Sequence, residues 1–152
     1  MIQKTAFLVQ MKGVATNYRY RLHFRGPYSE DLNLEAFRHQ AEFESPANRC
    51  ALDRNEQSIV DEFGEIFEFR PNQMEVAATY AFYVSYECLD PLNAYRKTRE
   101  FKSTVPAAQF ALGISRAKQF LYPPADEEIR EMRDEFAPWQ EASLEVMGRY
   151  HD

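Results

Sequence analysis

The residues with the strongest chemical character are the basic and aromatic side chains between positions 18 and 28. Over residues 18–25, Arg or His alternates with Tyr, Leu or Phe. In an extended segment this alternation puts the cations on one face and the apolar side chains on the other. Such a strip suits a protein contact, where Arg and Tyr are enriched, and it suits nucleic acid through stacking and charge. The candidate partner-binding residues are Arg19, Tyr20, Arg21, His23, Arg25 and Tyr28.

A second group of cations lies further along the chain in a stretch with helical spacing. Its members are Arg96, Lys97, Arg99 and Lys102. A basic helix can bind a phosphate backbone, and this is the alternative hypothesis for the site. The simpler interpretation is a solvated helix face that pairs with acidic residues elsewhere.

The chain shows no motif of an enzyme, a metal site or a cofactor site. It lacks a Gly-rich phosphate loop and a Gly-x-Ser-x-Gly elbow, and Cys50 and Cys88 fit neither a zinc pattern nor a redox pair. His23 with Glu30 and Asp31 resembles a base with orienting acids, but a lone His in a basic strand is more often a surface residue. We therefore expect a protein that is not an enzyme and that uses neither a metal nor a cofactor.

The net charge of −6 is concentrated at the C-terminal end of the 152-residue chain. Residues 1–122 carry 15 basic and 15 acidic side chains, and residues 123–152 carry 3 basic and 9 acidic ones. An acidic segment repels phosphates, so it disfavours bare nucleic acid as its partner. No apolar run approaches the ~20 residues of a membrane span. We expect a single domain over residues 1–152, in the cytoplasm and without membrane contact, with an acidic helical segment at 123–152.

The apolar periodicity predicts a mainly α fold of about seven helices with one short extended segment. The extended segment is expected at 18–25 and is expected to end at Gly26-Pro27. Ser29 is the expected cap of a helix over 29–40, in which Leu32, Leu34 and Phe37 can face inward. The remaining helices are expected at 2–12, 53–69, 72–88, from 90 onward, 104–121, 126–136 and from 138 onward. The 72–88 stretch is apolar on most faces, so we predict that it is the central buried helix.

Residues 18–32 resemble a stretch of the YwgA-like family and, more distantly, of the Panacea antitoxin domains. In that family, aromatic and basic residues are followed by Gly-Pro-Tyr-Ser, an acid and Leu, as in Gly26-Pro27-Tyr28-Ser29 and the residues after it. Residues 3–10 and 75–83 are similar to the helices that flank this stretch, so the resemblance covers residues 3–121. These families occur in prokaryotic toxin–antitoxin and phage-associated proteins. The resemblance implies a non-catalytic protein that binds a protein partner, as an antitoxin or phage-defence component. The alternative is a nucleic-acid-associated accessory subunit.

Overall fold

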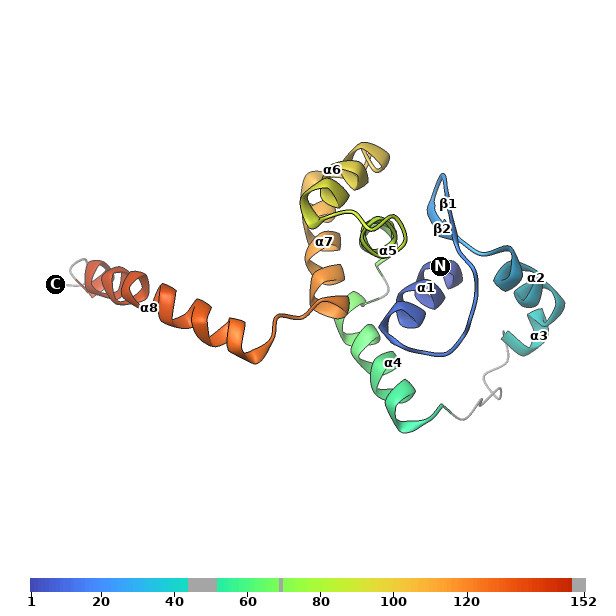
Figure 1. Cartoon of the computed structure of the whole chain (residues 1–152), viewed down its shortest axis with the longest axis horizontal. Helices are drawn as coiled ribbons and strands as arrows, with labels where there is room; N and C mark the ends of the chain where they lie inside the picture. The colour runs from blue at the N-terminus through green and yellow to red at the C-terminus, as the bar shows by residue number, and fades with distance from the viewer. Residues whose placement is uncertain (44–51, 69, 149–152) are drawn as a thin grey trace. The chain divides into compact units, whose positions relative to one another are not determined.

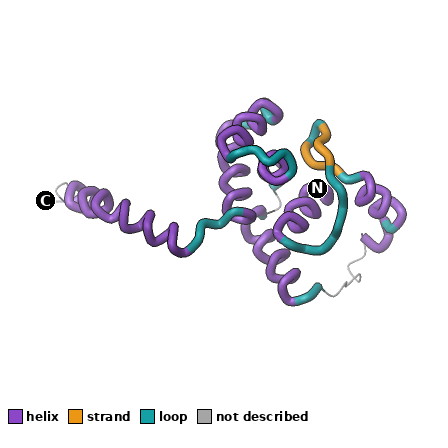
Figure 2. Tube along the Cα trace, viewed as in Figure 1, coloured by secondary structure: helices purple, strands orange, loops and turns teal. Residues whose placement is uncertain are grey.

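The computed structural model describes residues 1–43, 52–68 and 70–148, with the side chains of 43 and 139–148 left out. These residues form two compact units, 1–122 and 123–152, and the single-domain interpretation stays a prediction. Helices dominate the described chain, and its strands are confined to one small hairpin (Figure 2). The prediction of a mainly α fold is confirmed. The elements are α1 (Ile2–Lys12), β1 (Arg21–His23), β2 (Gly26–Tyr28), α2 (Glu30–Arg38), α3 (Gln40–Phe43), α4 (Arg54–Phe67), α5 (Pro71–Ser85), α6 (Pro91–Phe101), α7 (Ala107–Leu121) and α8 (Asp126–Gly148).

Three of the helices begin at side chains that cap their first turn. The Ser29 hydroxyl accepts a hydrogen bond from the Leu32 amide at 3.3 Å, as predicted. Asp53 and Glu56 form a capping box at the start of α4, with hydrogen bonds of 2.8 and 3.1 Å. Asp90 accepts from two amides at the start of α6. Each cap satisfies amides that the first turn of a helix leaves unpaired, a contribution of about 1 kcal/mol.

Helix α5 forms the centre of the 1–122 unit. Figure 1 shows it nearly end-on, with α1, α6 and α7 around it, and it also contacts β2. From Gln73 to Tyr83, every residue of α5 except Glu75 is buried. The predicted central helix is confirmed. It ends at Ser85, however, and Cys88 lies beyond it in an exposed left-handed turn.

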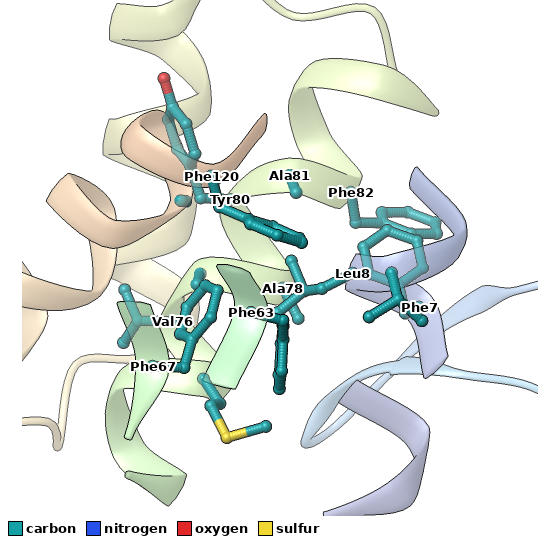
Figure 3. Packing of buried hydrophobic residues seen from close by; sticks show 14 of the residues in the cluster. Phe7, Leu8, Phe63, Phe67, Val76, Ala78, Tyr80, Ala81, Phe82 and Phe120 are labelled. Atoms are coloured by element: carbon teal, nitrogen blue, oxygen red, sulfur yellow. The ribbon is translucent and has the colours of Figure 1, made fainter. Parts of the chain in front are cut away.

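Aromatic rings fill the space between α5 and its neighbours. Phe63 and Phe67 of α4 meet Phe120 of α7, with ring centroids 5.7 Å apart in both pairs. On the other side of α5, Phe7 of α1 lies 6.2 Å from Phe82. Figure 3 shows these side chains around Ala78 and Ala81, whose small size admits the rings. Full burial of each Phe contributes about 1.5–3 kcal/mol.

Helix α2 differs from its prediction because it buries only one side chain. Leu32 is buried, as expected, but Leu34 and Phe37 are 50% and 79% exposed, so the expectation that these two face inward is wrong. The buried residues Ser29 and Leu32 anchor the first turn of α2. Most side chains of its later turns are exposed. A segment with helical periodicity can form a helix without having a partner for its whole apolar face.

The described part of the unit after Tyr122, up to residue 148, contains one helix instead of the two predicted. Pro138 lies inside α8 and does not end it. A proline inside a helix removes one backbone hydrogen bond and meets the carbonyl of residue i−4, and this can kink a helix without ending it. Among the described side chains of α8, Ile129, Met132 and Phe136 are exposed at helical spacing. No helix in the described ranges is both long and apolar enough to cross a membrane.

Candidate interaction site at the hairpin

The candidate site is an antiparallel hairpin with Leu22 opposite Pro27 and His23 opposite Gly26. Phe24 and Arg25 form the turn between the strands. Gly26-Pro27 therefore starts the second strand, and the expectation that it ends the extended segment is corrected. Proline tolerates this position because an isolated two-stranded ribbon consists only of edge strands. The extended segment is not an isolated strand, because β1 pairs with β2.

Gly26 lets the hairpin approach α5 closely. Its φ is +100°, and a Cβ there would lie 2.7 Å from the Thr79 hydroxyl of α5. That hydroxyl donates to the Glu75 carbonyl at 2.7 Å. A glycine is needed both for the backbone conformation and for the space.

Two polar side chains of α1 hold the second strand and the residue after it. The Gln3 side chain both donates to and accepts from the Ser29 backbone, at 3.0 and 2.8 Å. The Lys4 ammonium donates to the Pro27 carbonyl at 2.9 Å, and Lys4 is buried. Neither residue was among the predicted site residues. A signal for Lys4 was present, because a lysine in register with Phe7 and Leu8 lies in an apolar stripe where it must find a buried partner.

The predicted alternation holds over residues 19–23 and fails at the turn. Arg19, Arg21 and His23 are exposed, whereas the intervening apolar side chains are buried or half-buried. Phe24 was expected on the buried face but is 70% exposed, because it lies in the turn beyond the last strand pair.

The cations of the strip differ in what they contact. Arg19 Nε lies 3.7 Å from Asp31 Oδ2, and the Arg21 guanidinium pairs with the Glu30 carboxylate. Both ion pairs are exposed. Exposed pairs of this kind contribute at most about 1 kcal/mol. The centroid of the His23 ring lies 4.6 Å from that of Phe24 and 5.6 Å from that of Tyr28. The Arg25 guanidinium lies 5.5 Å from the Phe24 ring.

Tyr20 belongs to the core and not to the exposed strip. Its ring meets Phe7 edge-on at 4.9 Å, and its hydroxyl is buried with no hydrogen-bond partner among the described residues. Burial raises the pKa of this hydroxyl above its usual value, with a smaller effect of neighbouring Tyr18 and Tyr86. The exposed part of the strip is Arg19, Arg21, His23, Phe24 and Arg25.

Removing the buried hydroxyl should stabilise the protein. We expect Tyr20→Phe to raise the free energy of unfolding by about 1 kcal/mol, since a buried polar group without a partner costs free energy. The matched control is Tyr18→Phe, which loses a 2.6 Å hydrogen bond from the tyrosine hydroxyl to Glu35. At that more exposed position we expect a loss of about 0.5 kcal/mol. Urea unfolding measures both, and a Tyr20→Phe protein less stable than wild type would show that the hydroxyl has a partner.

A cavity of about 550 Å³ lies between the hairpin and the first turns of α1 and α5. His23, Phe24 and Arg25 line it from the hairpin, Lys4 from α1, and Met74 from α5. Burial lowers the pKa of the Lys4 ammonium, Glu75 raises it, and the charges of Lys102 and Arg25 lower it further. The cavity therefore combines apolar walls with closely spaced cations.

The second basic group does not form one exposed surface. Lys97 pairs with Glu87 at 3.1 Å, and Arg99 donates to the Val105 carbonyl at 2.8 Å. Lys102 is buried and pairs with Glu75 at 2.9 Å. In the described part of the chain, only Arg96 of this group has neither an ion pair nor a hydrogen bond.

Within the described ranges, no group of three or more His, Cys, Asp or Glu side chains is placed to hold a metal ion. Comparisons with models of known protein families, with curated protein sequences and with solved structures found no match. The fold and the site describe a mainly helical protein with a basic, aromatic hairpin beside a cavity.

Proposed function

We propose that this protein is a non-catalytic interaction protein that binds a protein partner through the tip of its hairpin. The observation that carries the proposal is Phe24, an aromatic side chain 70% exposed between His23 and Arg25. The hairpin that holds it is fixed to α1 and α5, so Phe24 projects from a supported base.

Exposed aromatic rings flanked by arginine are typical of the residues that dominate binding at protein interfaces. A large ring in water contributes little to the stability of the monomer, whereas its burial by a partner removes apolar surface from water at roughly 25 cal/mol per Å². Two further cations of the strip, Arg19 and Arg21, lie toward the open end of the hairpin, away from the turn, and already have acidic partners. They suit the polar rim of an interface and can guide an acidic partner toward Phe24.

The biological setting is proposed from the resemblance of residues 18–32 to the YwgA-like family and, more distantly, to the Panacea domains. On that basis, the protein acts in the cytoplasm as an antitoxin or as a phage-defence-associated component.

The alternative is an accessory subunit that contacts nucleic acid, within a larger complex, through the same hairpin cations. Basic and aromatic side chains together bind single strands through charge and stacking. The α6 group adds little to this alternative, because Lys97, Arg99 and Lys102 already have partners. The protein-binding hypothesis is therefore the stronger of the two.

The test compares two exposed phenylalanines. The protein is purified from its native host with its bound partner, and the affinity of the purified pair is then measured by calorimetry. We expect Phe24→Ser to weaken binding by about 30-fold, the effect of losing an interface hot spot of roughly 2 kcal/mol. Phe37→Ser in α2 is the control, because Phe37 is 79% exposed and lies outside the site. It should leave the affinity unchanged, and both variants should melt like wild type.

Equal affinities for wild type and Phe24→Ser would overturn the protein-binding proposal. Binding to single- or double-stranded nucleic acid is measured across a salt series at the same time. Tight binding that falls steeply with salt, without a partner protein, would favour the alternative instead.

A further inference from the structure

The cavity beside the hairpin has more positive than negative charge. Lys4, Arg21 and Arg25 line it together with two carboxylates, Glu30 and Glu75. Glu30 pairs with Arg21, and Glu75 pairs with Lys102, which adds a further cation at the edge of the cavity. Within the described chain, Lys4 and Arg25 form no ion pair. Glu75 acts on the charge of Lys4, but the four cations at the cavity outnumber its two carboxylates, and this excess favours an anion there.

The first turn of α5 adds partial positive charge to the same cavity. Pro71 and Met74 of this helix line it, and no side chain caps the amides of this turn. The first turn contains no acidic residue either. Pro71 has no amide hydrogen, and the Met74 amide donates to the Arg70 carbonyl at 3.0 Å, so the start of α5 acts on the cavity through the helix dipole. The helix start and the two cations lie on the same cavity, and both favour a group that carries negative charge.

The rest of the lining is apolar and aromatic. Phe24 and Tyr28 each pack beside His23, and all three line the cavity with Met74. A volume of about 550 Å³ lies within the range of sites that hold one small organic molecule. Such walls suit a planar apolar body, and the cations suit a charged group attached to it.

We propose that the cavity binds a small phosphate monoester with a planar body, of the size of a nucleoside monophosphate. Arg25 contacts the phosphate from the hairpin turn, Lys4 supplies positive charge from α1, and the dipole of α5 adds partial positive charge. The inference goes beyond the proposed protein partner and does not depend on it. Burial is the largest cause that lowers the pKa of Lys4, Glu75 raises it, and Lys102 and Arg25 lower it further. An anion at this place would offset the repulsion among these three cations.

The test uses adenosine 5′-monophosphate, adenosine and inorganic phosphate with the whole chain, by isothermal titration calorimetry at physiological salt. We expect saturable one-site binding of the monophosphate, and competition by inorganic phosphate. Adenosine should bind at least about tenfold more weakly, as expected when a charge-assisted contact of roughly 1.4 kcal/mol is lost.

Two charge reversals separate the cavity from general surface charge. Arg25→Glu should weaken monophosphate binding by at least about tenfold. Arg19→Glu changes the net charge equally, but Arg19 is highly exposed and does not line this cavity. Its effect should stay below about twofold, because salt screens exposed charges. Both proteins should melt close to wild type, since both positions are exposed.

The proposal is overturned if adenosine binds as well as the monophosphate, or if none of the three compounds binds. Equal losses in Arg19→Glu and Arg25→Glu would also overturn it, because they would indicate nonspecific attraction of anions. If partner binding depends on Phe24 but the protein binds no monophosphate, the protein-binding proposal stands and the monophosphate proposal fails. If the protein binds the monophosphate but Phe24→Ser leaves partner affinity unchanged, the monophosphate proposal stands and the protein-binding proposal fails.

Discussion

Gly113→Ala is expected to lower the free energy of unfolding by about 3 kcal/mol, because overpacking a close helix contact forces the backbone to move. Gly113 lies in the middle of α7 at its crossing with α5. A Cβ built there would lie 2.7 Å from Val76 Cβ and 2.9 Å from the Gln73 carbonyl oxygen. Neither atom is the end of a flexible side chain, so the two helices must separate. Separation would also loosen the aromatic contacts that Phe120 makes from α7.

The same substitution at Gly64 is the matched control. Gly64 also lies inside a helix, α4, but a Cβ there meets no atom within 4 Å. Alanine restricts the unfolded chain and favours the helix, so Gly64→Ala should raise stability by about 0.5–1 kcal/mol. Urea unfolding of both variants measures the difference. Similar effects at the two positions would mean that α5 and α7 do not cross as closely as this.

The helices were largely predictable because each depends on signals within a few residues. The 2–12 periodicity gave α1, and the Ser29 and Asp90 caps mark where α2 and α6 begin. These local signals fail where tertiary contacts determine which side chains are buried. Within the described ranges, no element covers the apolar face of α2, so Phe37 stays exposed although its spacing resembles a core position.

The site was only partly predictable for the same physical reason. Its exposed cations could be identified from the alternation of residues 18–25. The hairpin could not, because Gly26-Pro27 also fits a simple chain break, and only the contact with Thr79 of α5 shows why a glycine is required. Likewise, the ion pair between Glu75 and Lys102 joins residues from different elements, and no local pattern relates them. Lys102 therefore looked like part of a solvated or phosphate-binding run.

Tyr80→Asp is expected to abolish soluble expression, since it removes a large ring from the core and leaves a carboxyl group in its place. Tyr80 lies in α5 among the residues of the central cluster and is 2% exposed. Loss of a large buried aromatic side chain costs roughly 3–5 kcal/mol. A buried carboxylate without a partner adds several kcal/mol more. The sum is comparable with the whole stability of an ordinary domain, about 5–15 kcal/mol.

Tyr80→Phe separates the role of the ring from that of the hydroxyl. The ring then keeps its place, and the hydroxyl oxygen projects away from the other labelled rings in Figure 3. This variant should therefore remain soluble and unfold at nearly the same urea concentration as wild type. Phe82→Asp on the same helix should fail as Tyr80→Asp does, because Phe82 is buried against Phe7 and stacks on Tyr86 at 4.9 Å. A folded, soluble Tyr80→Asp protein with wild-type helix content would show that α5 is not the centre of the fold. The hairpin and Gly26 would then lack their support, since both contact α5.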